Sequence, residues 1–154
     1  MSQPGNAKHS PARFSTYVTA HENYMDQLRA TDFIGNDSLE IPPFESGLFK
    51  IRGEISCLGN IAVRVEKTLV VLGEEGETDP LVQTVDYAYN ASVRGYKSFL
   101  RYNNLHTVPG HKDAHHKNSF DWQTEEHLPG SPEWVGEAGW PTLGEYLEEV
   151  REWY

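Results

Sequence analysis

The feature that most restricts the fold is the alternation of apolar and polar residues in the middle of the chain. Residues 49–55 place apolar side chains or glycine at every second position, with charged side chains between them. The same alternation returns at residues 61–66, after a turn signal at Gly59–Asn60. Successive side chains of a strand point to opposite faces, so this pattern is typical of strands with one buried face. The two segments therefore predict a pair of antiparallel strands.

Two more strands are expected to extend this pair. Residues 82–93 follow an acidic loop at residues 73–80, and residues 97–103 follow a turn at Arg94–Gly95. Strands joined by short loops predict an antiparallel meander, because parallel strands need long crossover connections. In the last strand, side-chain alternation predicts one side for Phe99, Arg101 and Asn103 and the other side for Leu100 and Tyr102.

Helices are expected before and after this meander. Near the N-terminus, Thr19 and Glu22 have the spacing of a capping box, and a helix is predicted to continue to about Thr31, before a break at residues 35–37. Near the C-terminus, Thr142 and Glu145 form a second capping box. It precedes an apolar stripe at helical spacing, made of Leu143, Leu147, Val150 and Tyr154. The sequence therefore predicts an α+β fold in which a small antiparallel sheet of four to five strands packs against an N-terminal and a C-terminal helix.

Length and composition fit one domain. A chain of 154 residues with 38% hydrophobic content is long enough to bury a core without disulfides. Residues 1–15 lack periodicity, so we expect a disordered tail there and a single domain at residues 16–154. The single cysteine, Cys57, excludes an intrachain disulfide and a cysteine-based zinc cluster. Because no segment has the length of a membrane span or a secretory signal, a cytoplasmic protein without a membrane partner is expected.

One segment of this acidic chain is basic. The formal net charge is -10, yet residues 94–117 contain a single acid, Asp113. The basic residues of this basic segment are Arg94, Lys97, Arg101, Lys112 and Lys117. It also contains four of the seven histidines, namely His106, His111, His115 and His116. Any polyanionic partner would meet this segment, and clustered titratable groups on loops indicate a functional site.

The residue types of the basic segment suit metal-independent cleavage of RNA. That reaction needs a base to activate the 2′-hydroxyl, an acid to protonate the leaving 5′-oxygen, and cations near the charged phosphorane. Histidine titrates near neutral pH and fills either proton-transfer role, while arginine and lysine supply the cations. Tyr96, Tyr102 and Phe120 are available to stack on an unpaired base.

Other interpretations use the same residues. The H-x-x-x-H-H spacing at residues 111–116 would suit a metal-dependent enzyme with further ligands from His106, Asp113 or Asp121, but it matches no zinc signature and the neighbouring lysines repel a cation. A non-catalytic module that binds a partner protein through this segment is the other alternative. The aromatic residues of the strand also suit cross-strand packing. Outside the segment, the histidines are interpreted as structural: His9, His21 and His127.

The run FLRYNNLH at residues 99–106, followed at residue 115 by HHKNSFDW, resembles a pattern of the TumE family, the toxin members of two-gene toxin–antitoxin modules. Members of that family carry an aromatic-rich strand, an R-Y-D-N tetrapeptide and a later His-His-Lys turn. The matching positions here are Arg101, Tyr102, Asn103, Asn104, His106, His115, His116 and Lys117. Asn103 stands in place of the family's aspartate, and Asn118 in place of a histidine. The resemblance covers about residues 81–150.

The resemblance implies a toxin that inhibits growth through an RNA target, and a cognate antitoxin that masks the basic segment. Under this hypothesis the protein is an endoribonuclease that needs no metal or other cofactor. The predicted catalytic residues are His115 and His116 as the acid–base pair, with Arg101 and Lys117 as phosphate-contacting or charge-stabilising groups. Substrate binding is assigned to Tyr102, Asn103, His106 and Lys112. The expected partners are an RNA substrate and the antitoxin protein.

Overall fold

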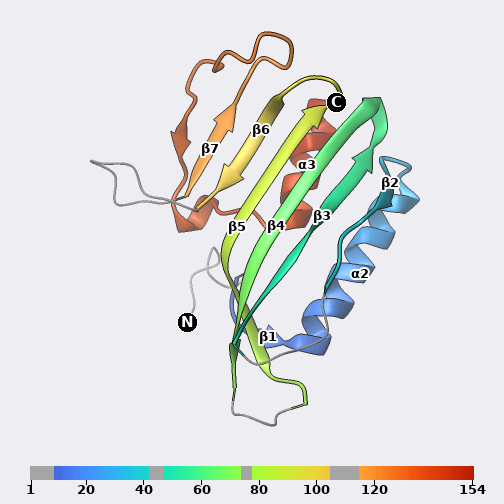
Figure 1. Cartoon of the computed structure of the whole chain (residues 1–154), viewed down its shortest axis with the longest axis vertical. Helices are drawn as coiled ribbons and strands as arrows, with labels where there is room; N and C mark the ends of the chain where they lie inside the picture. Colours follow the sequence, from blue (N-terminus) through green and yellow to red (C-terminus); the bar gives the residue numbers. More distant parts are fainter. Residues whose placement is uncertain (1–8, 42–46, 74–77, 105–114) are drawn as a thin grey trace.

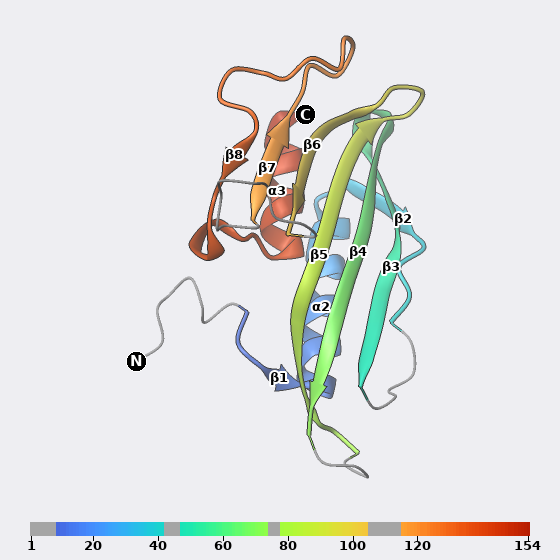
Figure 2. The same ribbon diagram turned by 60° about the vertical axis from the view of Figure 1, so that its left-hand side comes forward.

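The computed structural model describes residues 9–41, 47–73, 78–104 and 115–154. In this part of the chain, two α-helices lie on one face of an antiparallel sheet, while the opposite face carries no helix (Figures 1 and 2). The helices are α2 (Phe14–Ala30) and α3 (Leu143–Trp153). In spatial order, the strands are β2 (Ile34–Asp37), β3 (Leu48–Cys57), β4 (Ile61–Leu72), β5 (Leu81–Val93), β6 (Ser98–Asn103), β7 (His116–Ser119) and β8 (Glu133–Trp134), and β1 (Ala12–Arg13) pairs with the start of β5. We call the two sides the helix face and the helix-free face.

The predicted α+β class and antiparallel meander are confirmed, but the sheet contains eight strands in the described residues instead of four to five. The additional strands are short, between two and four residues each. Segments of this length do not show a periodic pattern. β2 even contains Gly35, Asn36 and Asp37, which we expected to form a break, because pairing of Ile34 with Cys57 of β3 overrides their turn preference.

The N-terminal helix begins at Phe14 and not at Thr19, which lies inside it. Its first turn is attached to the loop before β5, since Phe14 N donates to Pro80 O at 2.8 Å. Ser15 adds two bonds to the Asp79 carboxylate, one from its backbone N and one from Oγ, at 2.8 and 2.6 Å. Residues 12–15 are thus part of β1 and α2, although the sequence predicts a disordered tail at residues 1–15, and residues 1–8 lie outside the described part.

The core lies between the helix face and the two helices. Helix α2 contributes Met25 and Leu28, which are 3% and 2% exposed. Helix α3 contributes the predicted stripe of Leu143, Leu147 and Val150, whereas Tyr154 is 62% exposed. Each such aliphatic side chain stabilises the fold by about 1.5–3 kcal/mol when buried. The predicted capping box is also confirmed, because Thr142 Oγ1 accepts from Glu145 N and Thr142 N donates to Glu145 Oε1.

Strand β6 departs from simple alternation. Its register with β5 shifts, so that Leu100 lies opposite Ala91 but Ser98 lies opposite Ser92. This bulge brings both Phe99 and Leu100 into the core, at 1% and 5% exposure. Phe99 stacks on Trp153 of α3 with ring centroids 3.7 Å apart. The prediction that Phe99 shares a side with Arg101 is therefore wrong.

Neither described helix is long and apolar enough to span a membrane.

Candidate functional site

The register of β6 and β7 divides the residues of the basic segment between the two faces of the sheet. Arg101 pairs with Asn118, and Tyr102 pairs with Lys117. Paired residues of antiparallel strands point to the same side, while neighbours along a strand point to opposite sides. Tyr102 lies in the core beneath α3, so Tyr102 and Lys117 are on the helix face. Arg101 and Asn118 are consequently on the helix-free face.

On the helix face, Glu149 of α3 engages two of the predicted site residues. Lys117 Nζ lies 2.7 Å from Glu149 Oε2, and the Tyr102 hydroxyl donates to Glu149 Oε1 at 2.7 Å. Lys117 Nζ also lies 5.6 Å from the centre of the Tyr102 ring. Burial and then the Glu149 carboxylate raise the pKa of Tyr102 far above its ordinary value. These contacts attach α3 to the sheet, and Tyr102, at 7% exposure, does not present its ring to a base.

His115 also lies on the helix face, whereas His116 does not. The Tyr87 hydroxyl lies 3.3 Å from His115 Nδ1, and the His115 ring centroid is 5.0 Å from that of Trp140. Trp140 and Tyr87 both belong to the core. His116 pairs with Trp134 of β8, and their ring centroids are 6.1 Å apart. The predicted acid–base pair is thus divided between two faces, because adjacent residues of an extended chain point in opposite directions.

The helix-free face carries a row of polar residues that crosses four strands. Arg64 of β4 pairs with Asn90 of β5, which pairs with Arg101 of β6. Asn118 of β7 continues the row. Adjacent strands lie about 4.8 Å apart, so the Cα atoms of Arg64 and Arg101 are roughly 10 Å apart. We call these four residues the arginine–asparagine row.

Within the described part of the chain, neither arginine of this row is paired with an acid. In the described residues, no carboxylate oxygen lies within 4.0 Å of a side-chain nitrogen of Arg64 or Arg101. The Arg101 guanidinium lies over the Phe120 ring, 5.0 Å from its centre. Its Nε and the Oδ1 of neighbouring Asn90 are buried without a hydrogen-bond partner in this structure. Buried polar atoms without a partner are uncommon in folded proteins, so these two atoms distinguish the row from the rest of the sheet.

His116 and Asn118 are largely buried on the same face, at 5% and 9% exposure. Asn103, assigned to substrate binding, pairs with His116 in the neighbouring strand. The helix-free face therefore brings together three of the predicted site residues, Arg101, Asn103 and His116. It separates them from Tyr102, Lys117 and His115.

Other residues of the prediction are distributed more widely. His106, His111 and Lys112 lie outside the described residues. Tyr96 is half exposed and contacts Trp122 edge to face, with ring centroids 4.9 Å apart. In the described ranges, no three His, Cys, Asp or Glu residues are grouped so that they could hold a metal ion.

Sequence reasoning did not single out Arg64 and Asn90. Both lie on predicted strands at the polar positions of the alternation, and their pairing with Arg101 depends on the register between strands. The available signal was the alternation itself, which places Arg64 on the polar face of its strand. The sequence pattern also distinguishes Lys67, because this charged residue lies between Val65 and Leu69 on the apolar face of its strand.

Comparisons of this chain with models of protein families, with curated proteins and with solved structures find no match.

Proposed function

We propose that the chain is a toxin-like protein that acts on RNA through the helix-free face of β4–β7. The observation that carries this proposal is the arginine–asparagine row, in which Arg64 and Arg101 have no acidic partner among the described residues. The resemblance to the TumE family, in which Arg101 is a motif residue, adds to it.

The chemistry of the row suits the backbone of RNA. Arginine donates two parallel hydrogen bonds to phosphate oxygens, and stacking of Arg101 on Phe120 holds its guanidinium plane in place before a ligand arrives. The amides of Asn90 and Asn118 offer both donors and acceptors to the sugar or base edges. An antiparallel sheet with an open face is a recurrent surface for single-stranded RNA.

Charge on the same face supports this assignment. Two acids near the row are already compensated, since Glu54 pairs with Arg94 at 2.8 Å and Glu66 pairs with Lys50 at 3.2 Å. The chain as a whole is strongly acidic and would repel RNA elsewhere. Binding is therefore expected to depend on Arg64 and Arg101 and to weaken as the salt concentration rises.

For RNA cleavage, we infer different roles for the predicted catalytic residues. Arg101 contacts the phosphate and stabilises its developing charge. The His116 imidazole on the same face takes the 2′-hydroxyl proton as the 2′-oxygen attacks phosphorus, and it gives that proton to the 5′-oxygen as the P–O5′ bond breaks. Lys117 and Tyr102 position α3 through Glu149, and His115 packs against Tyr87. Cleavage without a metal remains the proposed reaction type, with RNA as the substrate and a cognate antitoxin as the partner that covers this face.

The test is induced expression in a bacterial host, with growth recorded and total RNA followed on a gel. We expect growth arrest and RNA breakdown with the wild type. Arg101→Met and His116→Gln should abolish both effects, because each removes the reactive group and preserves side-chain length. Lys117→Met is the matched control, since it removes a cation of the same segment from the opposite face. Circular dichroism of each purified variant checks that it is folded.

The alternatives give different results in the same experiment. Normal growth and intact RNA with folded wild-type protein would favour a non-catalytic binding module. Loss of activity in Lys117→Met, with full activity in Arg101→Met, would move the site to the helix face and contradict the proposal. Activity that a chelator removes would favour the metal-dependent alternative.

A further inference from the structure

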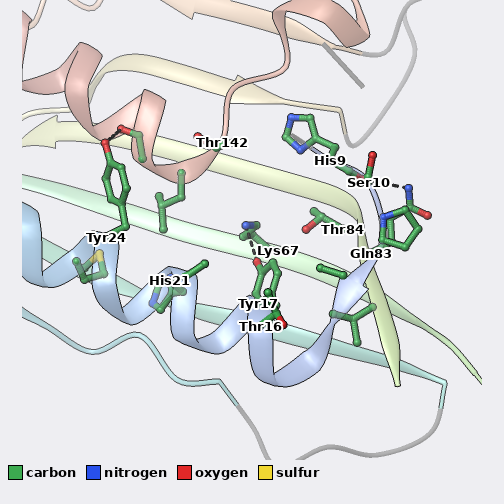
Figure 3. A pocket seen from close by; sticks show the side chains of 17 residues that line it. His9, Ser10, Thr16, Tyr17, His21, Tyr24, Lys67, Gln83, Thr84 and Thr142 are labelled. Carbon is green, nitrogen blue, oxygen red and sulfur yellow. Dashed lines mark hydrogen bonds between the residues drawn. The ribbon is translucent and has the colours of Figure 1, made fainter. Parts of the chain in front are cut away.

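A cavity of about 430 Å³ lies on the helix face, away from the arginine–asparagine row. Its walls come from α2, from residues 9–12, from β4 and β5, and from the start of α3 (Figure 3). One end is closed by a contact between the helices, where the Tyr24 hydroxyl donates to Gly144 O at 3.0 Å. The volume is typical of sites that enclose small organic ligands.

Of the described residues that line the cavity, one is permanently charged, Lys67. It projects from β4 into the space between the sheet and α2 (Figure 3), at a position flanked on the same face by Val65 and Leu69, which are 1% and 0% exposed. Lys67 Nζ donates to the Tyr17 hydroxyl at 2.7 Å. Among the described residues, no Asp or Glu lines the cavity, and no carboxylate oxygen lies within 4.0 Å of Lys67 Nζ.

A buried ammonium without an anion is unfavourable, and a protein usually compensates it with a counter-charge. Burial favours the neutral amine of Lys67, whereas the hydrogen bond from Lys67 Nζ to the Tyr17 hydroxyl favours the ammonium, and the net direction of the pKa shift is upward. Burial and then Lys67 lower the pKa of His21, so that His21 is neutral there. Among the described lining residues, Lys67 therefore supplies the fixed positive charge of the cavity.

The rest of the lining determines which kind of anion could accompany Lys67. Met25, Val82 and Leu143 supply apolar walls, while the hydroxyls of Thr84 and Tyr17 lie on the side of Lys67 (Figure 3). The N-terminus of α3 also forms part of the wall, and its dipole favours negative charge. A doubly charged phosphate ester would leave one charge uncompensated against the apolar walls, whereas one carboxylate matches one ammonium.

We propose that this cavity binds a small organic monocarboxylate with an apolar body, whose carboxylate pairs with Lys67 while the apolar walls enclose the remainder. The site is independent of the proposed action on RNA, because the two lie on opposite faces of the sheet.

The test is calorimetric titration of the full-length protein with decanoate, below the concentration at which it forms micelles. Wild-type protein should bind decanoate at least tenfold more tightly than 1-decanol, which has the same apolar body and no charge. Lys67→Met should remove this preference. Lys50→Met is the matched control, because Lys50 is an exposed lysine that pairs with Glu66 at 3.2 Å and does not line the cavity. Its decanoate affinity should equal that of the wild type.

A second variant keeps the proposal testable if Lys67→Met does not fold. Ala20→Phe places a ring at an exposed position of α2 that lines the cavity, so it should block decanoate and leave Lys67 intact. Equal affinity for decanoate and 1-decanol, or unchanged binding in both variants, would overturn the proposal. Decanoate affinity should be constant from pH 7 to pH 9, and a fall between pH 6 and pH 8 would assign the charge to a histidine instead. The RNA experiment has no bearing on any of these results.

Discussion

The two faces of β6 and β7 both carry basic residues next to aromatic rings, but the contacts of these basic residues differ. On the helix face, Lys117 and Tyr102 both contact Glu149, so their polar groups are already satisfied within the protein. On the helix-free face, Arg101 has an aromatic ring beneath it and no acid beside it in the described structure. Lys117, which forms an ion pair within the protein, stabilises the fold. Arg101, which stacks on an aromatic ring without an ion pair in the described structure, is available to an external anion.

This difference follows from where α3 packs. The C-terminal helix is amphipathic and carries acids on the side that meets the sheet edge, so it supplies Glu149 to the helix face only. The helix-free face receives no such element among the described residues (Figure 2). The comparison predicts that substitutions on the helix face change stability and that substitutions on the helix-free face change the interaction with RNA.

The largest expected effect is on stability. Tyr102→Ala removes a ring that is 7% exposed and the bond to Glu149, and buried aromatic residues cost about 3–5 kcal/mol when truncated to alanine. The free energy of unfolding, measured by urea denaturation, should fall by about that amount. Arg101→Met, the control on the neighbouring residue of the other face, should change it by less than about 1 kcal/mol. An equal loss of unfolding free energy in the two variants would contradict the prediction that the helix face contributes more to stability than the helix-free face.

Alkaline pH should also destabilise the protein through the helix face. Burial raises the pKa of Tyr89 from 10.0 to about 12, although nearby Lys67 opposes the shift. Below pH 10 the tyrosine is neutral in both states, and stability is unaffected. Between pH 10 and pH 12 it ionises in the unfolded chain first, so stability should fall by about 2–3 kcal/mol from this group.

The measurement is urea denaturation at intervals between pH 9 and pH 11.5. Tyr89→Phe should reduce the slope of stability against pH over this range, because phenylalanine does not ionise. Tyr96→Phe, which removes the hydroxyl of a half-exposed tyrosine at the end of the β5–β6 turn, is the matched control. A slope that Tyr89→Phe does not alter would assign the alkaline transition to other groups.

The fold was predictable where strands are long enough to show a period. β3, β4 and β5 contain between 10 and 13 residues, and their alternation predicted both the strands and the meander. β7 has the sequence His-Lys-Asn-Ser, without an apolar residue, so nothing in it indicates a strand. Its position depends on backbone pairing with β6, which is a tertiary interaction.

The same short strand explains what was not predictable about the site. Composition located the basic segment, and the resemblance singled out Arg101, His115 and His116. Whether two adjacent histidines face one substrate depends on whether the chain is extended there. His116 is the first residue of β7 and His115 directly precedes it. The chain is extended at this point, so the two side chains point to opposite faces of the sheet. The partners of Arg101, by contrast, come from strands distant in sequence, and only the register identifies Arg64 and Asn90.

The smallest expected effect separates a partly buried ion pair from an exposed one. The side chains of Lys117 and Glu149 are 25% and 33% exposed, whereas those of Lys97 and Glu125 are 78% and 41% exposed. Exposed pairs contribute about 0.2–1 kcal/mol, and solvent screens them further. A double-mutant cycle with Lys117→Met and Glu149→Gln should therefore give a coupling energy near 1 kcal/mol, and the equivalent cycle at Lys97 and Glu125 a value close to zero. Raising the salt concentration should reduce the first value only slightly, because a partly buried pair is screened less. If the two couplings are equal, the pairing of Lys117 does not distinguish the helix face from any other surface, and Lys117 would again have to be considered as a cation available to RNA.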